Sequence, residues 1–153
     1  MPEKQTMERA RKAKREGKAP TTQAGEFVRE EIEHVREGKH GARSTKQAIA
    51  IGLSKARRAG VALKPPRKGQ TSERTRKSAE HAYEEGQEHP NRKPSPARSR
   101  ATKRALKREG HSAVSRSALS RQARTAAARR RRTTKKTAST SKRRRSSTKS
   151  ASH

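Results

Sequence analysis

The sequence contains no cysteine, no tryptophan and no aspartate, and it has one phenylalanine and one tyrosine. The absence of cysteine excludes disulfide bonds, thiolate catalysis and zinc sites with thiolate ligands. All 14 acidic residues are glutamate, so aspartate, a common carboxylate of metal and catalytic sites, is missing as well. With so few aromatic residues, the chain has little with which to stack on the bases of a single strand.

Apolar residues are also scarce, because they make up 25% of the 153 residues. An ordinary domain has about 45–50%, in an average that also counts glycine. Burial of so little apolar surface cannot offset the entropy lost in ordering the whole chain. We therefore expect one small folded part and much disorder. No apolar run is long enough to span a membrane, and the N-terminal residues lack the apolar stretch of a secretory signal, so we expect a cytoplasmic protein.

Positive charge is what the chain has in abundance. It holds 43 Lys and Arg, and its formal net charge is +29. Residues 1–90 carry 21 Lys and Arg against 13 Glu, whereas residues 91–153 carry 22 against the single Glu109. This uneven distribution predicts a weakly basic head that ends near residue 90 and a strongly basic tail.

The best-defined element is a helix over residues 44–60, STKQAIAIGLSKARRAG. Ser44 is placed to cap its N-terminus, and Gln47 follows three residues later, as in a capping box. Gly60 is placed to end the helix in a left-handed conformation. Small and apolar residues recur at helical spacing on one side, namely Ala48, Ile49, Gly52, Leu53, Ala56 and Ala59.

A second amphipathic helix is predicted from about Thr22 to Glu37, with Gly38 at its end. Its predicted inward face consists of Val28, Ile32 and Val35, flanked by Ala24 and Phe27. Its opposite face is expected to form an exposed acidic stripe of Glu26, Glu30, Glu33 and Glu37. The connection to the next helix is short, so the two helices are expected to pack antiparallel, with Gly52 and Ala56 allowing a close approach.

Shorter helices are expected on either side of this pair. They span residues 6–16, capped by Thr6 and ended by Gly17, and residues 72–85, ended by Gly86. Residues 97–109 and 112–132 follow as alanine-rich helices with thin apolar faces, and residues 133–153 are of low complexity. The predicted fold class is mostly α, a helical head with a largely disordered basic tail. The predicted divisions are a basic arm (1–19), a helical-hairpin core (20–66), a further helix (67–90) and the tail (91–153).

Residues 44–60, and more broadly residues 8–69, resemble a bacterial family of short basic proteins of unknown function. The resemblance rests on STKQAIAIGLSKARRAG and on TQAGEFVREEIEHVREGKHGAR before it. It implies no activity. The tail is similar, in composition only, to the tails of linker-histone-like bacterial proteins.

The tail carries the strongest functional signal, because its cations are dense enough to neutralise a run of phosphates by counterion release. The predicted nucleic-acid-binding residues are Arg98, Arg100, Lys103, Arg104, Lys107, Arg108, Arg121, Arg124, Arg129, Arg130, Arg131, Arg132, Lys135, Lys136, Lys142, Arg143, Arg144 and Arg145. Such contacts do not depend on base sequence. The lack of stacking aromatics favours duplex DNA over specific RNA readout. We therefore expect a histone-like, DNA-binding protein of the bacterial nucleoid.

No catalytic or cofactor-binding pattern is present. The six histidines (His34, His40, His81, His89, His111 and His153) are scattered without paired ligand spacing, and they are interpreted as solvated surface residues. No nucleophile elbow or phosphate loop surrounds the serines and threonines. The chain is not expected to be an enzyme or to hold a metal, a cofactor or a small-molecule substrate.

Two other functions remain open. In the first, the helix pair is a protein-interaction module that self-associates or captures a partner, with Ile51 as an exposed anchor and the tail as a tether. The acidic stripe could then contact either the partner or the tail. In the second, the protein associates with RNA or the ribosome, which composition does not distinguish from DNA binding.

Overall fold

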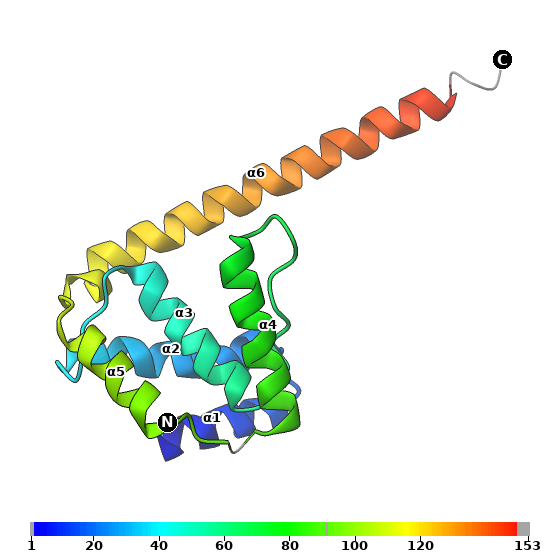
Figure 1. Ribbon diagram of the computed structural model, residues 1–153. Coiled ribbons are helices and arrows are strands. Elements are labelled where there is room, and N and C mark those ends of the chain that lie inside the picture. The colour runs from blue at the N-terminus through cyan, green and yellow to red at the C-terminus, as the bar shows by residue number, and fades with distance from the viewer. Residues whose placement is uncertain (1, 91, 150–153) are drawn as a thin grey trace. The chain divides into compact units, whose positions relative to one another are not determined.

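The computed structural model describes the backbone of residues 2–90 and 92–149, and the side chains of residues 2–90 and 92–134. The described residues form helices and no strand (Figure 1), which confirms the mostly α class. The chain divides into two compact units, Met1–Ser115 and Arg116–His153. The first unit contains α1 (Lys4–Arg15), α2 (Pro20–Arg36), α3 (Thr45–Arg58), α4 (Glu73–Glu88), α5 (Pro96–Lys107) and the 3-10 helix η1 (Ser112–Val114). The second contains α6 (Arg116–Lys149).

Glycines in the left-handed conformation follow the first three helices, as the sequence predicts. Gly17, Gly38 and Gly60 have φ angles of 70°, 73° and 83°. At the start of α3, the Ser44 hydroxyl accepts a hydrogen bond from the Gln47 N–H at 3.2 Å, which confirms the predicted cap. The Gln47 side chain reaches one residue further back than in a capping box, because it accepts from the N–H of Arg43 at 2.7 Å.

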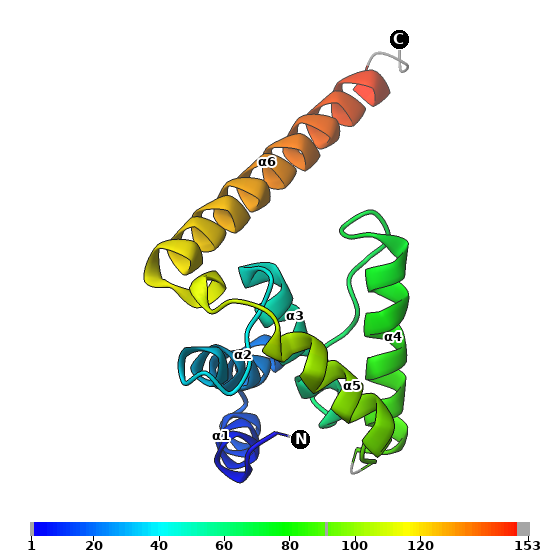
Figure 2. The ribbon, with the colours of Figure 1, turned by 60° about the vertical axis from the view of Figure 1, so that its left-hand side comes forward.

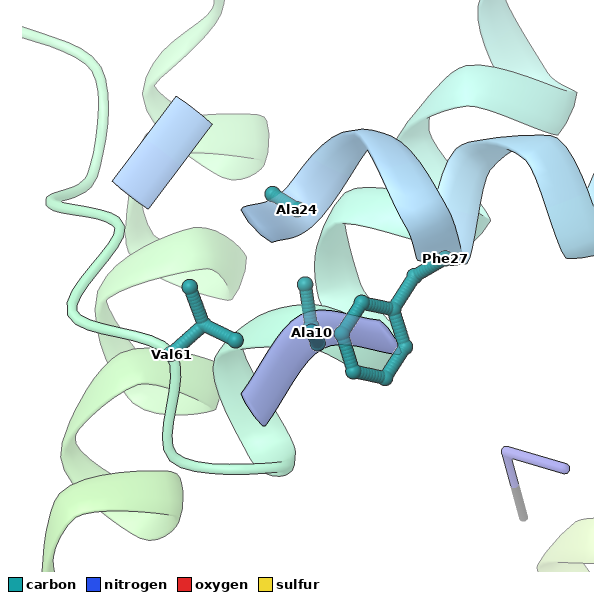
Figure 3. Packing of buried hydrophobic residues seen from close by; sticks show 5 residues of the cluster. Ala10, Ala24, Phe27 and Val61 are labelled. Atoms are coloured by element: carbon teal, nitrogen blue, oxygen red, sulfur yellow. The ribbon is translucent and has the colours of Figure 1, made fainter. Parts of the chain in front are cut away.

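The antiparallel pairing of α2 and α3 is visible in two small apolar clusters. One joins the first half of α2 to the end of α3 through Ala24, Phe27 and Ala56, with Ala10 and Val61 completing it (Figure 3). The other joins the end of α2 to the start of α3 through Val35 and Ala48. Because early α2 meets late α3 and late α2 meets early α3, the two helices run in opposite directions.

The inward face of α2 differs from the prediction. Ala24, Phe27 and Val35 are buried, but Val28 and Ile32 are only partly buried. Glu30 and Glu31 turn inward instead, with exposures of 1% and 0%. The predicted exposed acidic stripe is therefore wrong at Glu30. The physical reason is that both carboxylates face a cation, Lys55 of α3.

The flanking helices extend this pair on both sides. α1 packs against α2, and α4 packs against α3 (Figure 2). The predicted contacts of α4 are confirmed at Ala79 and Ala82, which are buried. Gly86 does not end α4, because the helix continues to Glu88. Gly86 is buried instead, at a point where a Cβ atom would collide with the carbonyl of Arg57.

One further prediction in this unit needs correction. Thr6 does not cap α1, because the helix begins at Lys4 and Thr6 is a buried residue within it. Ile51 is partly buried.

The compact unit extends to Ser115, beyond the boundary predicted at residue 90. The backbone N–H of Gly41 donates to the carbonyl of Leu106 at 2.9 Å, and that of Ala42 donates to Gly110 at 2.9 Å. The Thr45 hydroxyl donates to the carbonyl of Ala113. These contacts join the end of α5 and η1 to the connection between α2 and α3, which sequence patterns within single helices do not reveal.

α6 continues to Lys149, past residue 132, where the sequence predicted the last helix would end. The stretch predicted to be disordered, residues 133–153, lies almost entirely outside the described side chains, and residues 150–153 lie outside the described backbone as well.

Candidate nucleic-acid interface

α5 presents a group of cations on the surface of the first unit. Its N-terminus is capped by Ser95, whose hydroxyl accepts from the Arg98 N–H at 3.3 Å, and Pro96 occupies the first turn. Leu106 is the buried residue of this helix. The predicted binding residues here are all exposed, namely Arg98, Arg100, Lys103, Arg104, Lys107 and Arg108. They belong to the head and not to the tail to which the sequence assigned them.

α6 is the most basic element of the chain. Its 34 residues include 14 Lys and Arg and no acidic residue. The predicted binding residues whose side chains are described are all exposed, namely Arg121, Arg124, Arg129, Arg130, Arg131 and Arg132. Lys135, Lys136, Lys142, Arg143, Arg144 and Arg145 have side chains that lie outside the described residues.

The arginines at positions 129–132 are consecutive in a helix, so they surround it. Each residue is rotated by about 100° from the one before, because a turn contains 3.6 residues. Four neighbours therefore point to four sides of α6, and no side of this segment is apolar. Such a helix is suited to a diffuse array of negative charges and not to packing on an apolar surface.

The threonines of α6 whose side chains are described use their hydroxyls within the helix. Thr125 donates to the carbonyl of Arg121 at 2.8 Å, and Thr133 donates to that of Arg130 at 2.7 Å. Thr134 likewise donates to Arg131 at 2.9 Å. Among the described side chains of α6, the guanidinium groups are the charged donors that the helix offers to a ligand.

Base stacking has little support in the described residues. Phe27 is fully buried in the first apolar cluster, and Tyr83 is partly buried on α4. Single-stranded readers normally stack bases on exposed aromatic rings. Contact with the phosphate backbone is therefore the mode of binding that these side chains can provide.

The partly buried Glu26 and Glu33 of α2, and the exposed Glu37 directly after it, are paired with cations of the same unit. Glu26 accepts from Arg9 at 2.9 Å, Glu33 from Arg29 at 3.0 Å, and Glu37 lies 2.9 Å from the Lys39 ammonium. Each pair is at or near the surface, where an ion pair contributes at most about 1 kcal/mol. These pairs neutralise part of the positive charge of the head. The sequence of α6, by contrast, contains no acidic residue that could neutralise its cations.

A buried ionic cluster lies between α2 and α3. Lys55 lies 3.3 Å from a carboxylate oxygen of Glu30 and 2.7 Å from one of Glu31. Burial would raise the pKa of Glu30, but hydrogen bonds from the Glu3 N–H, the Thr6 hydroxyl and Lys55, together with the charge of Lys55, lower it below the ordinary value. The cluster thus keeps Glu30 ionised inside the fold.

Two of the histidines, His34 and His40, are not the solvated surface residues that the sequence predicted, whereas His111 is exposed. His34 and His40 have side chains that are each 13% exposed, and both lie at ion-pair distance from a glutamate. The Nδ1 atom of His111 lies 2.6 Å from the carbonyl of Val35 at the end of α2. The turn after α2 brings His34 and His40 together, with ring centroids 6.1 Å apart, and the linear spacing of histidines did not show this.

Among the described residues, none of the helices combines the length and the apolar character that crossing a membrane requires. Comparison with curated proteins and with solved structures gives no match. Residues 4–69 are similar to one protein family, described as a family of unknown function (DUF6496). The match covers α1, α2 and α3 and the turns between them, and it ends before α4.

Proposed function

We propose that this protein is a non-catalytic, largely sequence-independent nucleic-acid-binding protein and that duplex DNA is its preferred ligand. The observation that carries the proposal is α6, a helix with 14 cations and no acidic residue over its 34 residues. The exposed cations of α5 are a second basic surface, on the other unit. In a bacterium, a protein of this kind would act on the nucleoid.

The charge density of α6 supports phosphate binding. At a rise of 1.5 Å per residue, a helix of this length spans about 51 Å. Its cations then occur about once per 3.6 Å of helix axis, on all sides of the segment 129–132, so whichever side faces a duplex presents cations to its phosphates. Neutralising phosphates releases condensed counterions, which gives affinity without sequence preference.

The described residues include no exposed Phe, Tyr or Trp ring, which supports contact with the phosphate backbone. Phosphate contacts position a protein on a duplex without reading its sequence. Specific single-stranded RNA recognition, by contrast, relies on stacking and on contacts to base edges. These considerations favour a duplex, and they predict a small difference in affinity between unrelated sequences.

A matched pair of triple variants tests the proposal. The first, Arg130→Gln, Arg131→Gln and Arg132→Gln, removes three charges from α6. The control, Lys46→Gln, Lys64→Gln and Lys68→Gln, removes three charges from exposed lysines of the head. Both lower the net charge equally, so a difference between them reports where the phosphates bind.

We expect the α6 variant to lose affinity for every duplex alike and to show a log–log salt slope shallower by at most about 2.7, because each lost phosphate contact contributes about 0.9. The control variant should keep most of the wild-type slope of log affinity against log salt concentration. Equal losses in the two variants would show that only net charge matters and would reject α6 as the interface. Tighter binding to structured RNA than to duplex DNA would show that RNA, and not duplex DNA, is the preferred ligand.

A further inference from the structure

The end of α2 and the connection after it bring three potential metal ligands together. Glu31 and His34 lie one turn apart on the same face of α2. His40 follows Gly38, whose left-handed conformation turns the chain back. One ligand atom from each of the three residues lies within 4.8 Å of the other two. None of this depends on nucleic-acid binding.

Glu31 is buried without a satisfactory donor. Its side chain is fully buried, and neither of its oxygens accepts a hydrogen bond of acceptable geometry. Lys55 lies 2.7 Å from one oxygen and His40 lies 3.2 Å from the other, so these are electrostatic contacts without hydrogen-bond alignment. Lys55 is also shared with Glu30. Two buried carboxylates therefore face one ammonium, which leaves a negative charge that a further cation would neutralise.

His40 is oriented as a ligand would be. Its Nδ1 atom lies 3.0 Å from the carbonyl oxygen of Gly41, which can only accept, so Nδ1 carries the hydrogen. A neutral His40 then turns the lone pair of Nε2 toward the carboxylate of Glu31. Two lone pairs facing each other repel unless a proton or a metal ion lies between them. Histidines that bind metals commonly donate their other ring nitrogen to a backbone carbonyl in this way.

We propose that Glu31, His34 and His40 bind one divalent transition-metal ion such as Zn²⁺. Two imidazoles and one carboxylate form a known ligand type for this ion, with a fourth position left for water. At metal–ligand distances of about 2.0–2.1 Å, ligand atoms of a tetrahedral site are about 3.3 Å apart. The separation of 3.2 Å between Glu31 and His40 already matches this edge. The ligand atom of His34 lies within 4.8 Å of the other two, and the His34 ring, whose Nε2 atom is 2.9 Å from a carboxylate oxygen of Glu3, would move toward them to complete the site.

A bound ion would link the connection between α2 and α3 to α2 itself. Glu31 and His34 belong to the helix, whereas His40 precedes Gly41 and Ala42, which hold the end of α5. A ligand that binds the folded state alone stabilises it by mass action. The ion would therefore stabilise the head, and its ligands give it no evident catalytic role.

Titration of the full-length, tag-free chain tests the proposal. Zn²⁺ is added in a calorimeter, and Co²⁺ is added as a spectroscopic probe. We expect one equivalent to bind, the visible bands of tetrahedral Co²⁺ to appear and to be displaced by Zn²⁺, and the melting temperature of the head to rise. Mg²⁺ should have none of these effects, because it prefers oxygen ligands. Absence of stoichiometric Zn²⁺ and Co²⁺ binding would overturn the proposal.

Single variants locate the site. His34→Gln and His40→Gln should each lower the Zn²⁺ affinity at least tenfold and weaken the tetrahedral Co²⁺ bands. His81→Gln, at an exposed position on α4, is the matched control and should leave both unchanged. Unchanged affinity in His34→Gln, or an equal loss in the control, would contradict the assignment. If His40→Gln does not fold, as judged by circular dichroism, the comparison of His34→Gln with the control tests the assignment alone.

Discussion

Val28 of α2 lies directly against Gly52 of α3. A Cβ atom at Gly52 would be 2.6 Å from the Cα atom of Val28 and 2.9 Å from its nitrogen. Such distances are shorter than real Cβ atoms tolerate, so the two helix backbones touch with no side chain between them. This contact lies midway between the two apolar clusters and sets the spacing of the helix pair.

Replacing Gly52 with alanine should destabilise the head by about 1–3 kcal/mol, because the added methyl group forces α2 and α3 apart. The matched control is Gly25→Ala, an exposed helical position of α2 with no atom within 4 Å of the added methyl. It should stabilise the head by about 0.5–1 kcal/mol, the ordinary effect of alanine over glycine in a helix. Urea unfolding of both variants measures the difference. Equal shifts in the same direction would show that the two helices do not meet at Gly52.

Phe27 is the largest apolar side chain of the core and is completely buried. Phe27→Ala should cost about 3–5 kcal/mol, because it combines lost burial with a cavity. That loss is comparable to the whole stability of a small domain, so most of the head should unfold at 37 °C. Ile51→Ala, at a partly buried position of α3, should cost clearly less. Thermal unfolding followed by circular dichroism compares them, and similar melting temperatures would contradict the proposed core.

The stability of the head should fall in acid because of Glu30. Its pKa is lowered in the folded state relative to the ordinary value of 4.5. Its contribution is therefore fully present above pH 4.5 and is lost as the pH falls through the lower, folded-state pKa. Glu30→Gln should be less stable at neutral pH and should lose less stability on acidification. Glu16→Gln is the control, because Glu16 also has a lowered pKa but is exposed. Parallel stability–pH curves for wild type and Glu30→Gln would contradict the account.

Patterns within a few neighbouring residues were sufficient to predict much of the helical structure of the head. The cap at Ser44 and the glycines at positions 17, 38 and 60 mark helix ends through interactions within a few residues, which a sequence displays directly. The close approach at Gly52 was also predicted, because a small residue on an apolar face is a local feature. These signals were sufficient to predict the antiparallel pair.

Contacts between distant residues account for what the sequence did not predict. Helical spacing assigned Glu30 to the surface, because its burial depends on Lys55, which comes from another helix. The pairing of His34 with His40 depends on a turn in three dimensions. The extension of the head to Ser115 depends on backbone hydrogen bonds from Gly41 and Ala42, which no side-chain pattern encodes.

The helicity of α6 should increase when its charge is neutralised. Its cations repel one another along the helix, and like charges one turn apart oppose helix formation. Adding duplex DNA, or raising the salt concentration, should therefore increase the far-UV circular dichroism signal of the full chain. The Arg130→Gln, Arg131→Gln, Arg132→Gln variant should respond less than wild type. A signal that decreases on addition of DNA would contradict a helical binding mode.

The salt dependence of DNA binding tests the central claim most directly. Binding of the full chain to one duplex, and to a second duplex of scrambled sequence, is measured across a salt series. We expect log affinity to fall linearly with log salt concentration, with a slope steeper than about −5, because several phosphates are neutralised at about 0.9 each. The two sequences should differ by less than about tenfold in affinity, which corresponds to about 1.4 kcal/mol. A shallow slope together with a strong preference for one sequence would contradict phosphate neutralisation by α6.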